Sequence, residues 1–106
     1  MVVHQFEIYL VSLDPARGHE MRKTRPCVVV TPDSVNRHVQ TVLVAPLTSN
    51  IRKYPFRVAS NFGGRPGQIA VEQIRCVDHT RLLKRVGALN AGEAAAVRIN
   101  LVKMFA

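Results

Sequence analysis

A short basic stretch between two strand-like runs holds most of the side chains that could do chemistry. Residues 17–26 read RGHEMRKTRP, and the candidate functional side chains among them are Arg17, His19, Glu20, Lys23 and Arg25. Unpaired charge is too costly to bury, so this stretch must lie at the surface. It is therefore either a solvated loop that serves only solubility or a binding site for an anion.

Arg25 and Thr48 together could act on a phosphate group. A guanidinium offers planar, paired donors and stays charged, and a threonine adds a rigid hydroxyl donor. Cleavage of RNA without a metal ion also needs a base that takes the proton of the 2′-hydroxyl. Arginine is a poor base because its free pKa lies at about 12.5 or above, so Glu20 or His19 suits this role better. Two simpler interpretations compete with this one: Arg25 forms an ion pair with Glu20 or Asp14, and Thr48 only caps a turn.

Five strand-like runs would have to position these residues. Residues 5–13 alternate between two faces with period two and end at Asp14-Pro15, where proline cannot extend a ladder. Pro26 opens a valine-rich run, and Pro46 lies near the end of another. A turn-rich connection at 61–67 precedes the last run. The predicted strands are residues 5–13, 25–31, 39–47, 54–59 and 68–77.

We expect one groove where the ends of these strands converge. If the first, second, third and last runs are neighbours in one sheet, the loops at 14–25 and 48–53 flank the same groove. The side chains expected in or around it are Arg25, Thr48, Glu20, His19, Arg52 and Lys53. Within the last run, Glu72 is polar among apolar neighbours, and we expect it to pair with Arg75.

A helix is predicted only near the C-terminal end. Asn90 and Glu93 have the spacing of a capping box. The apolar residues that follow recur at three- and four-residue intervals and form one face, made of Ala94, Val97, Leu101 and Met104 or Phe105. Several short strands followed by one helix indicate a mostly β fold: a small, strongly bent antiparallel sheet, barrel-like in form, with the helix packed on it.

Composition narrows the class of protein. The chain fits one domain, residues 1–106, and its 15 Lys and Arg against 7 Asp and Glu give a net charge of +8, which favours a polyanionic partner. No apolar stretch approaches the roughly 18 residues that a membrane-spanning helix needs, and the first residues lack signal-peptide features. We expect Cys27 and Cys76 to be reduced and buried. No spacing of cysteine and histidine resembles a zinc site, so we expect a cytoplasmic protein without a metal or cofactor.

The order of short motifs along the chain resembles the MazF/PemK family of toxin–antitoxin ribonucleases. The motifs are IYLVSLDP at 8–15, GHE at 18–20, TRP at 24–26, NR at 36–37, PLTS at 46–49, YPF at 54–56, and EQIR at 72–75 followed by Asp78. No single motif is specific, but the series covers nearly the whole chain in order. One departure is Phe6, where relatives usually carry glycine, and we expect it to alter local packing only.

This resemblance implies a small antiparallel SH3-like barrel, as in CcdB and PemK toxins, that works as a homodimer. It implies a metal-independent, sequence-specific endoribonuclease that cuts single-stranded RNA, such as mRNA, and leaves 2′,3′-cyclic phosphate and 5′-hydroxyl ends. It also implies an acidic antitoxin partner of the MazE or PemI kind, which would fold over the groove and exclude RNA. We expect RNA bases to be read by side chains of the loops at 16–24, 49–53 and 61–67.

The family's catalytic residues can be carried over position by position. Its arginine, threonine and acidic loop residue fall on Arg25, Thr48 and Glu20. In the PemK branch, a loop histidine matching His19 and an acidic base matching Glu72 also contribute. That branch uses an arginine where this chain has Ala70, which favours the version with Arg25 and Thr48. Supporting or RNA-binding roles are expected for His19, Arg17, Lys23, Ser49, Arg52, Lys53, Glu72, Gln73 and Arg75.

Two other functions fit the sequence less well. A CcdB-like poison that binds gyrase without catalysis would lack the Arg-Pro and Thr-Ser pairs present at 25–26 and 48–49. A non-cleaving RNA-binding barrel would stack bases on aromatic side chains, but the chain has two tyrosines, four phenylalanines and no tryptophan. Mapping the ends of a treated RNA would separate cleavage from both.

Overall fold

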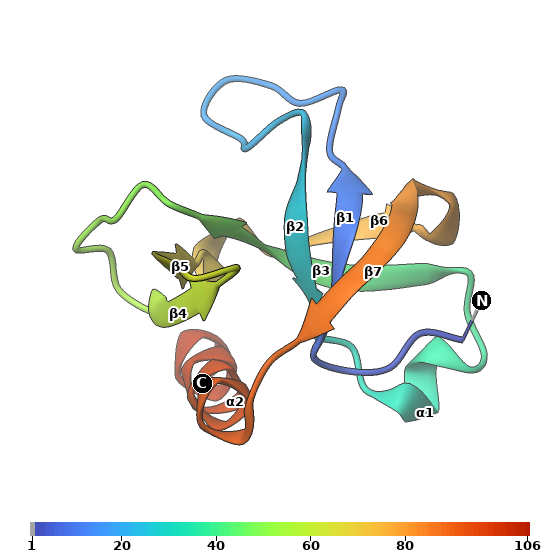
Figure 1. Ribbon diagram of the computed structural model, residues 1–106. Coiled ribbons are helices and arrows are strands. Elements are labelled where there is room, and N and C mark those ends of the chain that lie inside the picture. Colours follow the sequence, from blue (N-terminus) through green and yellow to red (C-terminus); the bar gives the residue numbers. More distant parts are fainter. Residues whose placement is uncertain (1) are drawn as a thin grey trace.

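The chain folds into a strongly bent antiparallel sheet with one long helix packed against it (Figure 1). The computed structural model describes residues 2–106. Within them the strands are β1 (Glu7–Ser12), β2 (Thr24–Val29), β3 (Thr41–Thr48), β4 (Val58–Phe62), β5 (Arg65–Ile69), β6 (Arg75–Asp78) and β7 (Leu82–Ala88). The remaining elements are the helices α1 (Asp33–Asn36) and α2 (Ala91–Phe105) and the 3-10 turns η1 (Val71–Gln73) and η2 (His79–Arg81). The prediction of a mostly β fold with a C-terminal helix is confirmed.

The strand order explains why distant residues meet. The hydrogen-bonded path runs β4-β5-β3-β2-β1-β7, and β6 pairs with the first half of β3. β2 lies between β1 and β3 and is antiparallel to both. The loop that joins β1 to β2 and the loop that follows β3 therefore leave the sheet at the same end.

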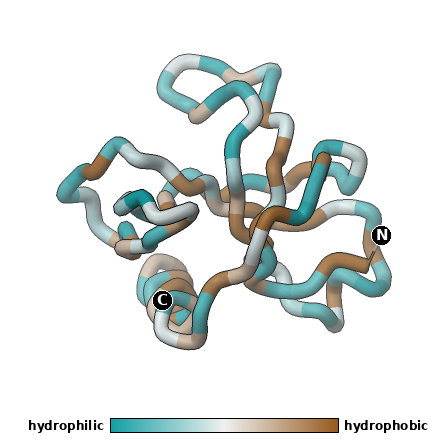
Figure 2. The backbone as a smooth tube through the Cα atoms, in the orientation of Figure 1, coloured by the Kyte–Doolittle hydropathy of each residue, from teal (hydrophilic) through white to brown (hydrophobic). Residues whose placement is uncertain are grey.

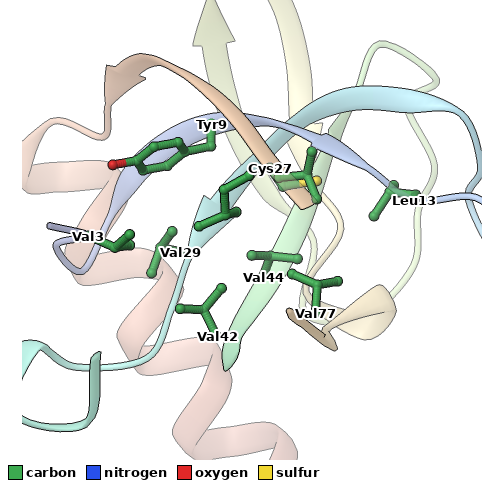
Figure 3. Close-up of a cluster of buried hydrophobic side chains, with 10 residues drawn as sticks. Val3, Tyr9, Leu13, Cys27, Val29, Val42, Val44 and Val77 are labelled. Atoms are coloured by element: carbon green, nitrogen blue, oxygen red, sulfur yellow. The ribbon is translucent and has the colours of Figure 1, made fainter. Parts of the chain in front are cut away.

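Alternation along the central strands divides the core into two layers. In β2, Cys27 and Val29 face one cluster, whereas Val28 faces the other. The first cluster, drawn in Figure 3, includes Tyr9 at 1% exposure. The second lies under α2 and includes the fully buried Val97. Full burial of a side chain of this size stabilises the fold by about 1.5–3 kcal/mol, so both layers fix the register of the central strands.

Helix α2 begins with the predicted capping box. The Asn90 side chain accepts a hydrogen bond from the Glu93 backbone N–H at 2.8 Å, and the Glu93 carboxylate accepts one from the Asn90 N–H at 3.1 Å. The same carboxylate accepts from the hydroxyl of Ser60 in β4 at 2.8 Å. The start of the helix is thereby tied to the sheet, and the predicted apolar face packs on the second core layer through Ala94, Val97, Leu101 and Met104.

The single strand predicted at 68–77 is wrong. The chain forms β5 up to Ile69, turns through η1 and then forms β6. β5 pairs with the end of β3 and β6 with its beginning. The 3-10 turn takes up the residues between these two ladders, and the Ala70 N–H donates to the Pro46 carbonyl at 2.8 Å where they separate.

The boundaries predicted around the second hairpin are also wrong. The strand expected at 54–59 corresponds to β4, which begins four residues later than predicted. The broad turn expected at 61–67 is a tight two-residue turn. Gly63 and Gly64 have φ values of 61° and 77°, the left-handed region that glycine adopts without strain. Strand β7 and helix α1 were not predicted, because their residues show neither clear alternation nor a long apolar face.

Cys27 is buried as expected, but Cys76 is exposed, so the prediction for Cys76 is wrong. Cys76 pairs with Leu43, which is itself exposed, on the outer face of the β3–β6 ladder. An apolar run does not reveal which of its two faces is covered, because burial depends on what packs against the sheet.

Phe6 changes the backbone as well as the local packing. Its φ is 69°, in the left-handed region, where a residue other than glycine costs about 1–3 kcal/mol. Burial to 9% exposure offsets part of this strain, and the Arg98 guanidinium lies 5.0 Å from the centroid of the Phe6 ring. Glycine at this position would avoid the strain. The expectation that Phe6 affects packing only is therefore incomplete.

Hydropathy follows this architecture (Figure 2). The centres of β1 and β3 are apolar, whereas the loops that follow these two strands are largely hydrophilic. Across residues 2–106, no helix combines the length and the apolar character that crossing a membrane requires.

Candidate active-site groove

A groove of about 830 Å³ lies where the loops after β1 and β3 leave the sheet. Both loops project beyond the strands in Figure 1. The predicted site residues that line this groove are His19, Glu20, Arg25, Thr48, Ser49, Arg52 and Gln73. The topology thus brings together side chains that are up to 54 positions apart in the sequence.

Arg25 and Thr48 occupy adjoining strands at one end of the sheet. Cys27 pairs with Pro46 in the β2–β3 ladder, and Arg25 and Thr48 lie two residues beyond that pair on their respective strands. Arg25 is partly buried, and its Nη1 lies 3.3 Å from the Met21 sulfur. Antiparallel pairing therefore brings the guanidinium and the hydroxyl to the same wall of the groove.

The guanidinium of Arg25 is not neutralised by a carboxylate. Within residues 2–106, neither Glu20 nor Asp14 forms an ion pair with it, and its Nε is buried without a hydrogen-bond partner. Asp14 instead accepts a hydrogen bond from the Lys23 backbone N–H at 3.0 Å. The alternative in which Arg25 serves only as an ion-pair partner is therefore wrong, because no carboxylate of the described residues neutralises its charge.

Thr48 does cap a turn, as its simpler interpretation suggested. Its Oγ1 accepts a hydrogen bond from the Asn50 backbone N–H at 3.1 Å. This contact uses a lone pair and leaves the hydroxyl proton free to donate, so the turn fixes the hydroxyl without occupying it. Gly67 of β5 packs against the Thr48 backbone so closely that a Cβ there would lie 2.6 Å from the Thr48 carbonyl oxygen.

Positive charge dominates the groove. Four lining arginines form no ion pair within the described residues: Arg22, Arg25, Arg52 and Arg65. Glu20 is the carboxylate among the lining residues, and it accepts a hydrogen bond from the Arg17 backbone N–H, which closes the turn of the β1–β2 loop. Clefts lined by one sign of charge concentrate ligands of the opposite sign.

Several predicted residues lie elsewhere. Arg17, Lys23 and Lys53 are exposed but do not line the groove. Glu72 and Arg75 line a smaller adjoining cavity of about 190 Å³, which Glu20 and Gln73 also reach.

The predicted pairing of Glu72 with Arg75 is wrong. Arg75 donates to the Leu13 carbonyl at 3.0 Å, whereas Glu72 pairs with Arg57 at 2.7 Å. Arg57 also lines the groove, and so do Asn50 and Tyr54. Arg57 is partly buried and comes directly before the buried Val58, so its charge needs a partner. Nothing in the sequence identifies Glu72 as that partner.

Neither a thiol nor a metal cluster is part of this groove. Burial raises the pKa of the Cys27 thiol to about 12, although the charges of Arg25 and Arg75 act in the opposite direction. A thiol in this environment is not a nucleophile at neutral pH. No group of three or more histidine, cysteine, aspartate or glutamate side chains within residues 2–106 could hold a metal ion.

Comparison with known proteins gives consistent matches along the chain. The model of the family described as PemK-like, MazF-like toxin of type II toxin–antitoxin system matches residues 4–105. The chain is 40% identical to endoribonuclease MazF9 of Mycobacterium tuberculosis over 84% of each chain. It is 34% identical to endoribonuclease EndoA of Bacillus subtilis, over 85% of this chain and 83% of the relative. The crystal structure of MazF from Deinococcus radiodurans superposes with a TM-score of 0.86 at 25% identity and covers 99% of this chain and 97% of that one.

Proposed function

Because the chain belongs to the family of PemK-like and MazF-like toxins of type II toxin–antitoxin systems, we propose that it cleaves single-stranded RNA without a metal ion, through Arg25 and Thr48. The chain is a toxin endoribonuclease, as its relatives are named. This membership confirms the resemblance that the sequence motifs predicted. One observation carries the proposed chemistry: an unpaired guanidinium and a turn-fixed hydroxyl line one positively charged groove.

In the proposed reaction, the 2′-oxygen of a ribose attacks the adjacent phosphorus. A base at the rim, Glu20 or His19, takes the 2′-hydroxyl proton, the bond from phosphorus to the 5′-oxygen breaks, and that oxygen takes up a proton from water. Arg25 and Thr48 donate to the non-bridging oxygens, where negative charge develops. Removing one donor of this kind typically costs about 10²–10³ in rate. The products are a 2′,3′-cyclic phosphate and a 5′-hydroxyl.

The charge of the groove supports two polyanionic partners. Single-stranded RNA would bind through its phosphates to the unpaired arginines, with the release of counterions. An acidic antitoxin segment would bind to the same arginines and exclude RNA, as expected for a toxin of this family acting in the cytoplasm. Mixing the toxin with an acidic antitoxin peptide should therefore block cleavage, and the block should weaken at high salt.

A homodimer is supported by the outer face of α2. Ile99, Val102 and Phe105 are 54%, 65% and 72% exposed and lie at three-residue intervals on this helix. Exposed apolar side chains at this helical spacing favour contact with a second protein surface over contact with water. Sedimentation at micromolar concentration should give a dimer, and a monomer would contradict this part of the proposal.

The proposal is tested by mapping the ends of a long, unstructured transcript after incubation with the purified protein. We expect cuts at a short recurring sequence, with cyclic phosphate and 5′-hydroxyl ends, and equal rates with and without excess EDTA. Loss of cleavage in EDTA would contradict metal independence, and 5′-phosphate ends would contradict attack by the 2′-hydroxyl. Intact RNA would contradict the nuclease function itself.

A further inference from the structure

Arg57 is held almost out of solvent by Glu72. The Arg57 side chain is 5% exposed, and its Nε lies 2.9 Å from each of the two carboxylate oxygens of Glu72, while its Nη2 lies 2.7 Å from one of them. This forked contact occupies both oxygens of the carboxylate. A carboxylate engaged in this way is poorly placed to take a proton from a ribose hydroxyl.

Arg57 is the last residue of the β3–β4 loop, residues 49–57, and the same guanidinium extends the contact to the rest of this loop. Its Nη1 donates to the side-chain oxygen of Gln68 at 2.9 Å and lies 3.4 Å from the Asn50 carbonyl. Gln68 in turn accepts from the Arg52 backbone N–H at 3.0 Å and donates to the Arg52 carbonyl at 3.1 Å. The Tyr54 ring covers the guanidinium, with its centroid 4.9 Å from Cζ. Glu72, Arg57 and Gln68 thus form a relay, a chain of side-chain contacts that links η1 and β5 to the loop.

The β3–β4 loop has little else to hold its shape. Apart from the turn at Pro55 and Phe56, the described residues of this loop form no backbone–backbone hydrogen bond with one another or with the sheet. Its backbone is held by side chains instead: Thr48 at Asn50, Gln68 at Arg52, and Arg57 at Asn50. Yet this loop supplies one wall of the groove. A polar network that satisfies a loop in this way fixes one conformation among the many open to a free chain.

We propose that the relay of Glu72, Arg57 and Gln68 is a positioning device that sets the conformation of the β3–β4 loop and so determines which RNA sequences the groove accepts. Glu72 acts in this relay and not as the general base, which leaves that role to Glu20 or His19. The inference rests on the proposed function, because the loop can select bases only if RNA occupies the groove. Single-stranded RNA is read by side chains that contact splayed bases, and such contacts depend on the placement of their loop.

Two substitutions separate positioning from catalysis. Gln68→Met removes the contacts to Arg52 while it keeps the length of the side chain, and Glu72→Gln keeps the shape of the carboxylate but removes its charge. Gln40→Met is the matched control, because Gln40 is exposed just before β3 and its side chain forms no hydrogen bond within the described residues. Each variant is given the same long transcript, and kcat/KM is determined at every cut site.

For Gln68→Met we expect the ratio of kcat/KM between the preferred site and its single-base variants to fall about tenfold. The amide of Arg52 should also exchange with solvent faster than in the wild type. For Glu72→Gln we expect the cut-site pattern to change, kcat to fall by less than about tenfold, and the pH–rate profile to keep its shape, whereas loss of a general base costs about 10²–10⁴. Gln40→Met should match the wild type in all of these.

The inference is overturned if Gln68→Met keeps the wild-type cut-site pattern. It is also overturned if the kcat of Glu72→Gln falls by more than about 10²-fold at every site and its pH–rate profile no longer shows an acidic limb, as removal of a general base would cause. A wild-type protein that leaves RNA intact would instead overturn the proposed function, so the two failures are distinguishable.

Discussion

Substitution of Gly67 tests whether the groove depends on the close approach of β5 to the end of β3. In Gly67→Ala, the new Cβ would lie 2.6 Å from the Thr48 carbonyl oxygen, about 0.8 Å short of the 3.4 Å at which ordinary contact begins. The atom it meets belongs to the backbone, so no side chain can rotate away. The end of β3 must move, and it carries the Thr48 hydroxyl with it.

This contact gives the expected size of two effects of Gly67→Ala, the loss of stability and the loss of cleavage rate. Overpacking of this kind costs about 1–3 kcal/mol, and each kcal/mol lowers the Tm of a domain of this size by roughly 4–8 °C. A displacement approaching 1 Å at a catalytic group can reduce the rate by about 10²-fold. We therefore expect Gly67→Ala to lower the Tm by at least about 4 °C and kcat/KM by about 10–100-fold.

The assay compares Gly67→Ala with Gly87→Ala in thermal melts and in cleavage of an RNA that carries the mapped site. A Cβ at Gly87 in β7 would meet Phe62 and Ile8 side-chain atoms at 3.6 and 3.9 Å, which is ordinary contact. Alanine restricts the unfolded chain more than glycine does. The control Gly87→Ala should therefore be as stable as the wild type or more stable by about 0.4–1 kcal/mol at most. Wild-type stability and activity in Gly67→Ala would refute the close approach on which the geometry of Thr48 depends.

Three further predictions concern stability and titration. Glu93→Ala removes the capping box and the contact to Ser60, and it should cost about 2–3 kcal/mol in urea unfolding, whereas Glu93→Gln, which can still complete a capping box, should cost less. Equal losses in both variants would contradict the assigned contacts. Cys76 is exposed, whereas burial raises the pKa of Cys27 to about 12, so a thiol reagent at pH 8 should label one cysteine in the native protein and two after denaturation. Rapid labelling of both in the native state would be inconsistent with this fold. The hydrogen bond and charge of Asp33 raise the pKa of His4 above 6.5, so the stabilisation from this pair is fully present below pH 6.5 and is lost as the pH rises through the raised value. An NMR titration should show the pKa of His4 moving back toward 6.5 in Asp33→Asn, and an unchanged value would exclude Asp33 as the cause.

The sequence predicted best those elements whose local pattern agrees with their environment. The side chains of strands β1, β2 and β3 alternate between two buried layers, and α2 begins with a capping box. The three strands and the helix could therefore be located from the residues alone. Residues 69–71 are all fully buried and look like the middle of a strand, yet the chain turns there because β5 and β6 pair with different halves of β3. That break is imposed by the sheet and leaves no local signal.

In the candidate site, too, some residues could be identified from the sequence and one important contact could not. Arg25 and Thr48 could be identified because each lies at the end of a patterned strand, and antiparallel pairing then brings them together. The partner of Glu72 could not be identified, because Arg57 is fifteen positions away on another element and many other arginines were available. Which charged side chains form a buried pair depends on side-chain geometry that a one-dimensional pattern does not contain.

The most direct test of the account is a double-mutant cycle on Arg25 and Thr48, measured as kcat/KM on an RNA that carries the mapped site. Arg25→Ala and Thr48→Ala should each lose at least about 10²-fold while thermal melts show a folded protein. The double variant should lose little more than the worse single variant, because groups that act as a unit on one phosphate are not additive. Cleavage at the wild-type rate by folded Arg25→Ala would contradict the assignment of Arg25 as a donor to the reacting phosphate.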